Sequence, residues 1–230
     1  MKSSFEGFPP EALKFLRQLK RNNNRDWFLA HKDVYEQKVK APMTELVMEL
    51  GYRLQQTAPE LNVNSKQAIY RIYRDIRFSA DKTPYKTHVA AIFVPKGIPK
   101  HCGACLYFHI EPAEIMIAGG VYMPDSAALK ALRQHIAANW EELAAITKQR
   151  NFKKMFGDLQ GDRLTRPPMG FSADHPAIEV LKQKQFYVSC SEPAELAETP
   201  ELFHRLMTYF LAMLPLVQFL NVPLKSWKLD

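Results

Sequence analysis

Residues 104–123, "ACLYFHIEPAEIMIAGGVYM", predict two β-strands joined by a tight turn. The two halves, 104–110 and 114–123, are rich in the β-branched and aromatic side chains that are typical of strands. The three residues "EPA" between them are enough for a hairpin, whereas parallel strands need a crossover of about a dozen residues or more. The stretch therefore predicts an antiparallel pair.

Neighbouring segments extend this pair into a larger sheet. "AIYRIY" from residue 68 and "HVAAIFV" at 88–94 predict strands before it, and "QFYVSC" at 185–190 predicts a late one. Gly119 and Gly120 lie within a strand pattern without the helix that a phosphate-binding loop requires, so we expect a bulge or close packing there. We expect an antiparallel meander over about residues 68–123, with an added strand near 185–190.

Helical patterns precede and follow the predicted sheet. Pro9 and Pro10 open the first helix, Asn22–24 supply a turn, a second helix begins near Asp26, and Pro42 starts a third. Ser126 is a predicted N-cap, and "TPELFHRLMTYFLAML" at 199–214 predicts a closing helix. The order of helices, sheet and helices indicates an α+β fold, which we expect to form a single domain over residues 1–230.

Composition is that of a globular protein, with 47% hydrophobic and 24% charged residues in 230. The apolar run "YFLAMLPLVQFL" is shorter than the roughly 20 residues of a membrane span, and we expect Pro215 to interrupt it, so we predict core and no membrane association. The first residues show no secretory pattern, and three cysteines do not make a disulfide framework. These features predict a cytoplasmic location.

The formal net charge of +7 is concentrated in two segments. Residues 70–88 hold five basic and two acidic side chains, and residues 147–170 hold six basic and two acidic ones. The rest of the chain is balanced, with 20 of each sign. We therefore expect an anionic partner to be drawn to these two segments, provided that the fold brings them together.

The first basic segment is "YRIYRDIRFSADKTPYKTH". Whether it forms a strand or a helix, several of its charged side chains lie close together. As a strand it places Arg74 on the side of Tyr70 and Ile72, where an unpaired charge would be costly. As a helix it aligns Arg71 and Arg74 with Asp75. After Phe78 the composition predicts an ordered loop.

Two interpretations of this cluster remain open from the residues alone. Arginine forks and lysines suit an anionic ligand, above all a phosphorylated one, with Asp75 and Asp81 orienting the cations. The predicted ligand-binding residues are Arg71, Arg74, Arg77, Lys82, Tyr85 and Lys86. Alternatively, the two carboxylates pair internally with two of the cations, and the cluster is a salt-bridge network of a structural or interaction protein.

Catalytic groups are less well marked. His109 and Glu111 fall on one side of a predicted strand, and with Asp75 or Asp81 they form a candidate set for acid–base chemistry. These four are the candidate catalytic residues, and the sequence establishes neither an enzyme nor a cofactor.

Cys102 and Cys105 have the C-x-x-C spacing of redox pairs, but a strand rather than a helix is predicted after them. A zinc site would need further ligands from elsewhere in the fold. We therefore expect no metal site.

Nucleic-acid binding through both basic segments is the alternative function. Trp27 and Phe28 could stack on bases, and the second segment, which mixes Phe152 and Phe156 with Lys153 and Lys154, could clamp a polyanion. We expect Trp27 and Phe28 to belong to the core, and residues 147–170 to form a solvated helix and loop. The sequence predicts no oligomeric state.

The pattern Arg71-x-x-Arg74-Asp75-x-Arg77-Phe78, followed by Asp81-Lys82 and Tyr85, resembles the signature of a family of bacterial proteins with fungal relatives, a conserved domain of unknown function. "FEGFPPEALKFLRQL", "NNNRDWFLAHKDVYE" and "YFHIEP" are similar to the same family, so the resemblance extends from about Phe5 to Pro223. It implies a single domain with this motif as its hallmark. It implies no activity, cofactor or substrate.

Overall fold

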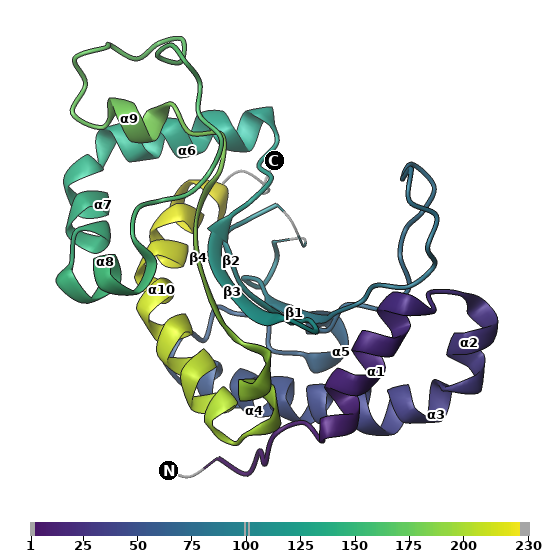
Figure 1. The fold of residues 1–230 in the computed structure, drawn as a ribbon. Coiled ribbons are helices and arrows are strands. Elements are labelled where there is room, and N and C mark those ends of the chain that lie inside the picture. The colour runs from purple at the N-terminus through teal and green to yellow at the C-terminus, as the bar shows by residue number, and fades with distance from the viewer. Residues whose placement is uncertain (1–2, 99, 101, 226–230) are drawn as a thin grey trace. The chain divides into compact units, whose positions relative to one another are not determined.

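The computed structural model of the chain describes residues 3–98, 100 and 102–225. It confirms the predicted α+β class, because a four-stranded antiparallel sheet is preceded and followed in sequence by helices. The strands pair in the order β1-β2-β3-β4, so that consecutive strands are neighbours, as in a meander (Figure 1).

The four strands are β1 (Val89–Phe93), β2 (Cys105–Ile110), β3 (Glu114–Val121) and β4 (Phe186–Pro193). The predicted hairpin joins β2 to β3, and the Glu111 N–H donates to the Glu114 carbonyl at 3.0 Å. Along β2, half-buried residues alternate with fully buried ones, because successive side chains point to opposite faces of a strand. One face of β2 therefore belongs to the core, and the other is partly open.

Helices account for most of the remaining chain. Those before the sheet are α1 (Pro10–Arg21), α2 (Arg25–Ala30), α3 (Lys32–Val34), the π-helix η1 (Tyr35–Lys40), α4 (Ala41–Thr57) and α5 (Ser65–Ala68). Those after β3 are α6 (Ser126–Ala138), α7 (Trp140–Thr147), α8 (Arg150–Phe156), α9 (Ile178–Leu181), the 3₁₀-helix η2 (Ala194–Glu198) and α10 (Glu201–Lys225).

The chain divides into two compact units. Unit 1 comprises Met1–Phe93, Tyr107–Ile117 and Ser191–Met207, and unit 2 comprises Val94–Leu106, Ala118–Cys190 and Thr208–Asp230. Strands β2, β3 and β4 and helix α10 contribute residues to both. The single domain expected from the sequence stays a prediction.

In unit 1, α1 opens with proline at its first turn and buries apolar residues at helical spacing, as predicted. Phe15 from this face meets Phe28 and Tyr35, with ring centroids 6.3 and 5.9 Å away. Burial raises the pKa of the Tyr35 hydroxyl to about 12. The helix predicted from Asp26 through Tyr35 is instead divided into α2, α3 and the start of η1.

In unit 2, two features show how closely β3 is packed. A Cβ at Gly120 would lie 2.2 Å from the Phe186 carbonyl oxygen, and its φ of +129° belongs to the region that favours glycine. A Cβ at Gly119 would lie 2.9 Å from the Met213 sulfur on α10. The close packing predicted for these glycines is confirmed.

Two boundary predictions were wrong. Residues 68–73 do not form a regular strand. Ile69 forms an isolated bridge with Ala91 of β1, whereas Tyr73 forms one with Tyr85, so the chain leaves the sheet between Ile69 and Tyr73. The N-cap of α6 is Asp125 rather than Ser126, because the Asp125 carboxylate accepts the Ala128 N–H at 2.8 Å.

Helix α10 also runs further than predicted, since it continues through Pro215 to Lys225. A proline inside a helix deprives the carbonyl four residues earlier of its donor, and that residue, Leu211, is exposed. By length and composition alone this helix could cross a membrane. Half of its most apolar window is buried inside the protein, however, and core helices of soluble proteins meet the same criteria.

Asn221 on α10 provides a test of the polar packing inside unit 2. It is only 2% exposed, and its side-chain amide accepts the Ala104 N–H and donates to the Ala104 carbonyl, both at 2.9 Å. We expect N221A to lower the free energy of unfolding by about 2–4 kcal/mol, because both backbone groups lose their partner in the interior. Urea denaturation measures this. The exposed neighbour Val222 is the control, and equal effects of V222A and N221A would contradict the prediction.

Candidate functional site

Residues 70–88, which we call the arm, lie entirely in unit 1 and connect α5 to β1. Figure 1 shows this segment leaving the sheet and returning to it beside α1 and α2. Its two limbs pair with each other: the Lys86 N–H donates to the Ile72 carbonyl at 2.8 Å, and the Arg74 N–H donates to the Pro84 carbonyl at 2.9 Å. Residues 75–83 form the loop at its end, which we call the tip.

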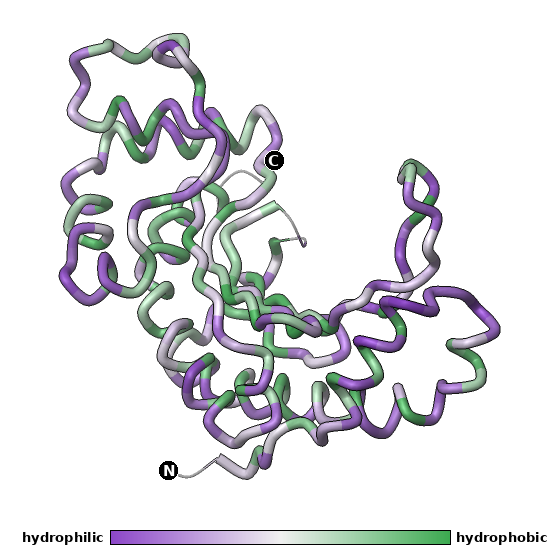
Figure 2. Tube along the Cα trace, viewed as in Figure 1, coloured by the Kyte–Doolittle hydropathy of each residue, from purple (hydrophilic) through white to green (hydrophobic). Residues whose placement is uncertain are grey.

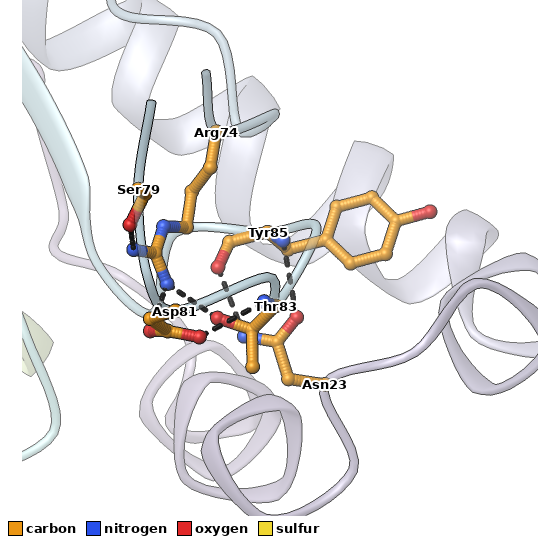
Figure 3. A network of polar contacts seen from close by, with 6 residues as sticks. All are labelled: Asn23, Arg74, Ser79, Asp81, Thr83 and Tyr85. Atoms are coloured by element: carbon orange, nitrogen blue, oxygen red, sulfur yellow. Dashed lines mark hydrogen bonds and ion pairs between the residues drawn. The ribbon is translucent and has the colours of Figure 1, made fainter. Parts of the chain in front are cut away.

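The returning limb is anchored to the turn between α1 and α2. The Asn23 side chain accepts the Tyr85 N–H at 3.1 Å and donates to the Tyr85 carbonyl at 2.9 Å (Figure 3). The Tyr85 ring stacks on Phe28 with centroids 4.1 Å apart, and Tyr85 is only 4% exposed. In this structure Tyr85 therefore anchors the arm.

Arg74 is the centre of the polar contacts within the tip. Its guanidinium donates to the Asp81 carboxylate and the Thr83 hydroxyl, and to the Ser79 hydroxyl at 3.5 Å (Figure 3). The Thr83 N–H donates to Asp81 Oδ1 at 2.9 Å, which closes the network. Hydrogen bonds from Arg74 hold the pKa of Asp81 at about 2.

A second pair lies beside this network. Arg77 binds Asp75 through two parallel hydrogen bonds, Nε to Oδ1 at 3.0 Å and Nη2 to Oδ2 at 2.7 Å. These bonds hold the pKa of Asp75 at about 2. Each carboxylate of the arm is thus bound by an arginine of the arm.

The lysines of the arm bind its backbone. Lys82 donates to the Ile76 carbonyl at 3.0 Å in the tip, and Lys86 donates to the Arg71 carbonyl at 2.9 Å where the limbs pair. Arg71 itself is exposed. The predicted cluster is therefore spread between the tip and the base of the arm, and a ligand-binding role for Arg71, Arg74, Arg77, Lys82, Tyr85 and Lys86 stays a prediction.

At the base of the arm, five half-buried residues of unit 1 meet in what we call the base cluster: Tyr70, Lys86, His88, Tyr107 and His109. The Lys86 ammonium lies 5.1 Å from the centre of the Tyr70 ring, and the Tyr70 and Tyr107 rings meet edge to face at 6.2 Å. The Tyr107 hydroxyl is hydrogen-bonded to His109 Nδ1 at 3.1 Å, and the His109 and His88 rings are 5.0 Å apart.

The two imidazoles of the base cluster are neutral at neutral pH. Burial, reinforced by the charges of His109 and Lys86, lowers the pKa of His88 to about 4. Burial also lowers the pKa of His109, against the opposing charges of Glu111 and Glu114. Glu111 thus acts on His109 through charge, whereas Asp75 and Asp81 are bound to arginines in the tip.

Sequence reasoning identified Lys86 and His109 but missed Tyr70, His88 and Tyr107 as members of one group. A signal was present for Tyr107 and His109, because both alternate with buried residues along β2 and so share its open face. His88 directly precedes the fully buried β1, and only the pairing of β1 with β2 brings it to His109.

The structure also bears on cysteine reactivity and on metal binding. Cys105 begins β2, as predicted, and burial raises the pKa of its thiol to about 12, which does not favour a reactive thiolate. In the part of the chain that the structure describes, no group of three or more His, Cys, Asp or Glu side chains could hold a metal ion.

A groove of about 840 Å³ lies elsewhere in unit 1, along η1 and α4. Its lining includes Ser4, Met48 and Tyr52 but none of the predicted site residues.

The second basic segment, 147–170, belongs to unit 2. Its aromatic residues Phe152 and Phe156 are only 3% and 6% exposed, and Lys153 forms an ion pair with Asp158. Neither phenylalanine is available to stack on a base.

Residues 11–219 match the family described as a conserved hypothetical protein, DUF2461. The chain belongs to the DUF2461 family. The match confirms the resemblance found in the sequence, with the arm motif inside it. No curated protein and no solved structure is significantly similar to the chain. Because the description of DUF2461 assigns no activity, the function has to be argued from the residues.

The Arg74 network makes a prediction about local stability. The Arg74 side chain is 26% exposed and that of Asp81 is 56% exposed, so the pair is screened by water. We expect R74A to lower the free energy of unfolding by less than about 1 kcal/mol while amide hydrogen exchange in residues 75–83 becomes faster. R77A, which breaks only the pair with Asp75, should accelerate exchange less. A loss of about 3–5 kcal/mol, typical of a broken buried pair, would contradict this account.

The neutral His88 makes the stability depend on pH. Its pKa is lowered from 6.5 to about 4 in the folded protein, so between these values the unfolded chain binds a proton that the folded protein does not. The free energy of unfolding should therefore fall as pH falls through this window. We expect H88Q to lose less stability than the unsubstituted protein between about pH 7 and about pH 5, with a difference on the order of 1–2 kcal/mol.

Urea denaturation at the two pH values measures this difference. The exposed His204 on α10 is the control, and H204Q should follow the unsubstituted protein. Equal pH dependence in all three proteins would show that His88 is not responsible.

Proposed function

We propose that this DUF2461 protein binds an anionic, phosphorylated ligand at the base cluster. The observation that supports this most directly is that one ammonium, two imidazoles and two tyrosine rings meet there. Ammonium and phenol groups are donors to phosphate oxygens, and an imidazole becomes a donor at both nitrogens when protonated. The base cluster, rather than the tip, is the favoured place, because both carboxylates of the tip already bind its arginines.

The low pKa values of the two histidines fit this proposal. Lys86 is close enough for its positive charge to lower the pKa of His88, so the cluster disfavours a further cation. A bound dianion would reverse the sign of that effect and favour the imidazolium forms. Ligand binding should therefore be accompanied by proton uptake and should become tighter as pH falls.

Acid–base chemistry would be a consequence of such binding. A neutral imidazole within hydrogen-bond reach of a bound group is what general-base catalysis requires. His88 and His109 are therefore the residues at which hydrolytic chemistry would be sought. Ligand binding would precede any catalysis, because a general base can act only on a substrate that is positioned beside it.

Lys86 and Lys82 form a matched pair for the test. Both donate to a backbone carbonyl of the arm, but Lys86 belongs to the base cluster and Lys82 to the tip. We expect K86M to weaken binding of inorganic phosphate or pyrophosphate by about 10-fold or more, because a hydrogen bond to a charged group contributes about 1.5–3 kcal/mol. K82M should leave the affinity unchanged. Isothermal titration calorimetry measures both.

Sulfate is the probe for the pH dependence, because its charge is constant over the relevant range. Its affinity should rise on acidification in the unsubstituted protein, and less so in H88Q. Absence of phosphate, pyrophosphate and sulfate binding, or an equal loss in K82M and K86M, would overturn the proposal.

A further inference from the structure

The tip of the arm carries a large aromatic side chain that the anion site does not use. Phe78 is 95% exposed, whereas the aromatic residues of the second basic segment are buried. Single exposed hydrophobic residues are common and carry little meaning alone. Phe78 differs because the surrounding structure supports its position.

The tip supplies its own internal bonds. Arg74 joins residues 79, 81 and 83, Lys82 reaches back to the Ile76 carbonyl, and Asp75 holds Arg77 through two bonds. None of these contacts involves the Phe78 side chain, so the loop does not need that ring for its fold. The Arg77 guanidinium lies 5.8 Å from the centre of the Phe78 ring. A planar cation and an aromatic ring are thus held next to each other on an exposed loop.

The surroundings of the arm are strongly basic. The arm has a net charge of +3, and Figure 2 shows that it is largely hydrophilic along its length. Asn23 binds it to the turn between α1 and α2, where Lys20, Arg21 and Arg25 are all exposed. Residues 20–26 contain three basic residues and one acidic residue.

We infer that the arm is a binding element for single-stranded nucleic acid, with Phe78 stacking on a base and the surrounding cations lying along the phosphates. Single-strand binding proteins combine a basic track with aromatic rings on which bases stack. A single strand fits better than a duplex, because only unpaired bases offer a face to a ring at the end of a loop. An acidic protein would match the charge but gives no reason for an exposed ring beside a guanidinium.

Binding of a fluorescein-labelled single strand of about 12 nucleotides, measured by fluorescence anisotropy with the full chain, tests this inference. We expect F78A to weaken binding by about 5-fold or more, since one stacked base contributes about 1–3 kcal/mol, and F78W to retain it. Because Phe78 is exposed, F78A should fold normally. Tyr52 is an equally large aromatic residue of unit 1, 63% exposed on α4, and Y52A should bind like the unsubstituted protein.

Salt dependence identifies the electrostatic part. The affinity should fall linearly with the logarithm of salt concentration, and R71Q or K82Q should each reduce that slope by about one. If F78A and Y52A bind equally well, or if polyglutamate competes as well as the oligonucleotide, the arm binds polyanions or acidic proteins by charge alone and the inference fails. Absence of binding at low salt also overturns it. K86M tests the anion site separately, because Lys86 lies at the base of the arm and Phe78 at its tip.

Discussion

The guanidinium of Arg74 binds oxygen atoms of three other residues of the arm. The conformation of the tip depends on these contacts. Beyond the hydrogen bond between Arg74 and Pro84, the two limbs no longer pair through their backbones in a regular ladder. The chain must then close a nine-residue loop, residues 75–83, with side chains. Arg74 does this because a guanidinium has five donors in a fixed plane and can reach Asp81, Thr83 and Ser79 together. A lysine could not hold the same three oxygens in one plane.

This arrangement distinguishes a ligand site from an internal salt-bridge network, two roles that the amino-acid composition alone leaves open. Arginine next to aspartate in a basic stretch is equally typical of a ligand site and of an internal network, and in the tip the bonds are internal. The remaining cations lie at both ends of the arm, with Arg71 and Lys86 at its base and Lys82 in the tip. The tip is thus held by bonds that do not involve Phe78, while the base brings Lys86 to the open face of β2.

Most of the fold could be predicted because it depends on local patterns. The period-two alternation of β2, the three-residue turn after Ile110 and the proline at the start of α1 each determine their element without distant partners. The errors lie where a local signal was ambiguous. Ser126 and Asp125 are both good N-caps, and only the Ala128 N–H shows which one is used. Pro215 is a helix breaker in isolation, but it lies within a long helix whose apolar side chains are largely buried.

The candidate site could be predicted only in part, for a different reason. Arg74, Asp75, Arg77 and Asp81 are close in sequence, so their mutual pairing needs little more than a turn. The base cluster instead takes residues from the arm, from the start of β1 and from β2, and its members become neighbours only when β1 pairs with β2. No local pattern contains that information.

The two parts of the arm also differ in what their charges can do. In the tip, both carboxylates are already paired with arginines, so a partner can gain from the net positive charge and from the exposed ring. At the base, burial lowers the pKa of both histidines, and for His88 the neighbouring Lys86 ammonium adds to this effect. An anion that enters there would remove part of that effect, whereas an apolar ligand would leave it unchanged. The same physical fact, a cation-rich segment with too few carboxylates, therefore favours stacking at one end of the arm and charge-coupled binding at the other.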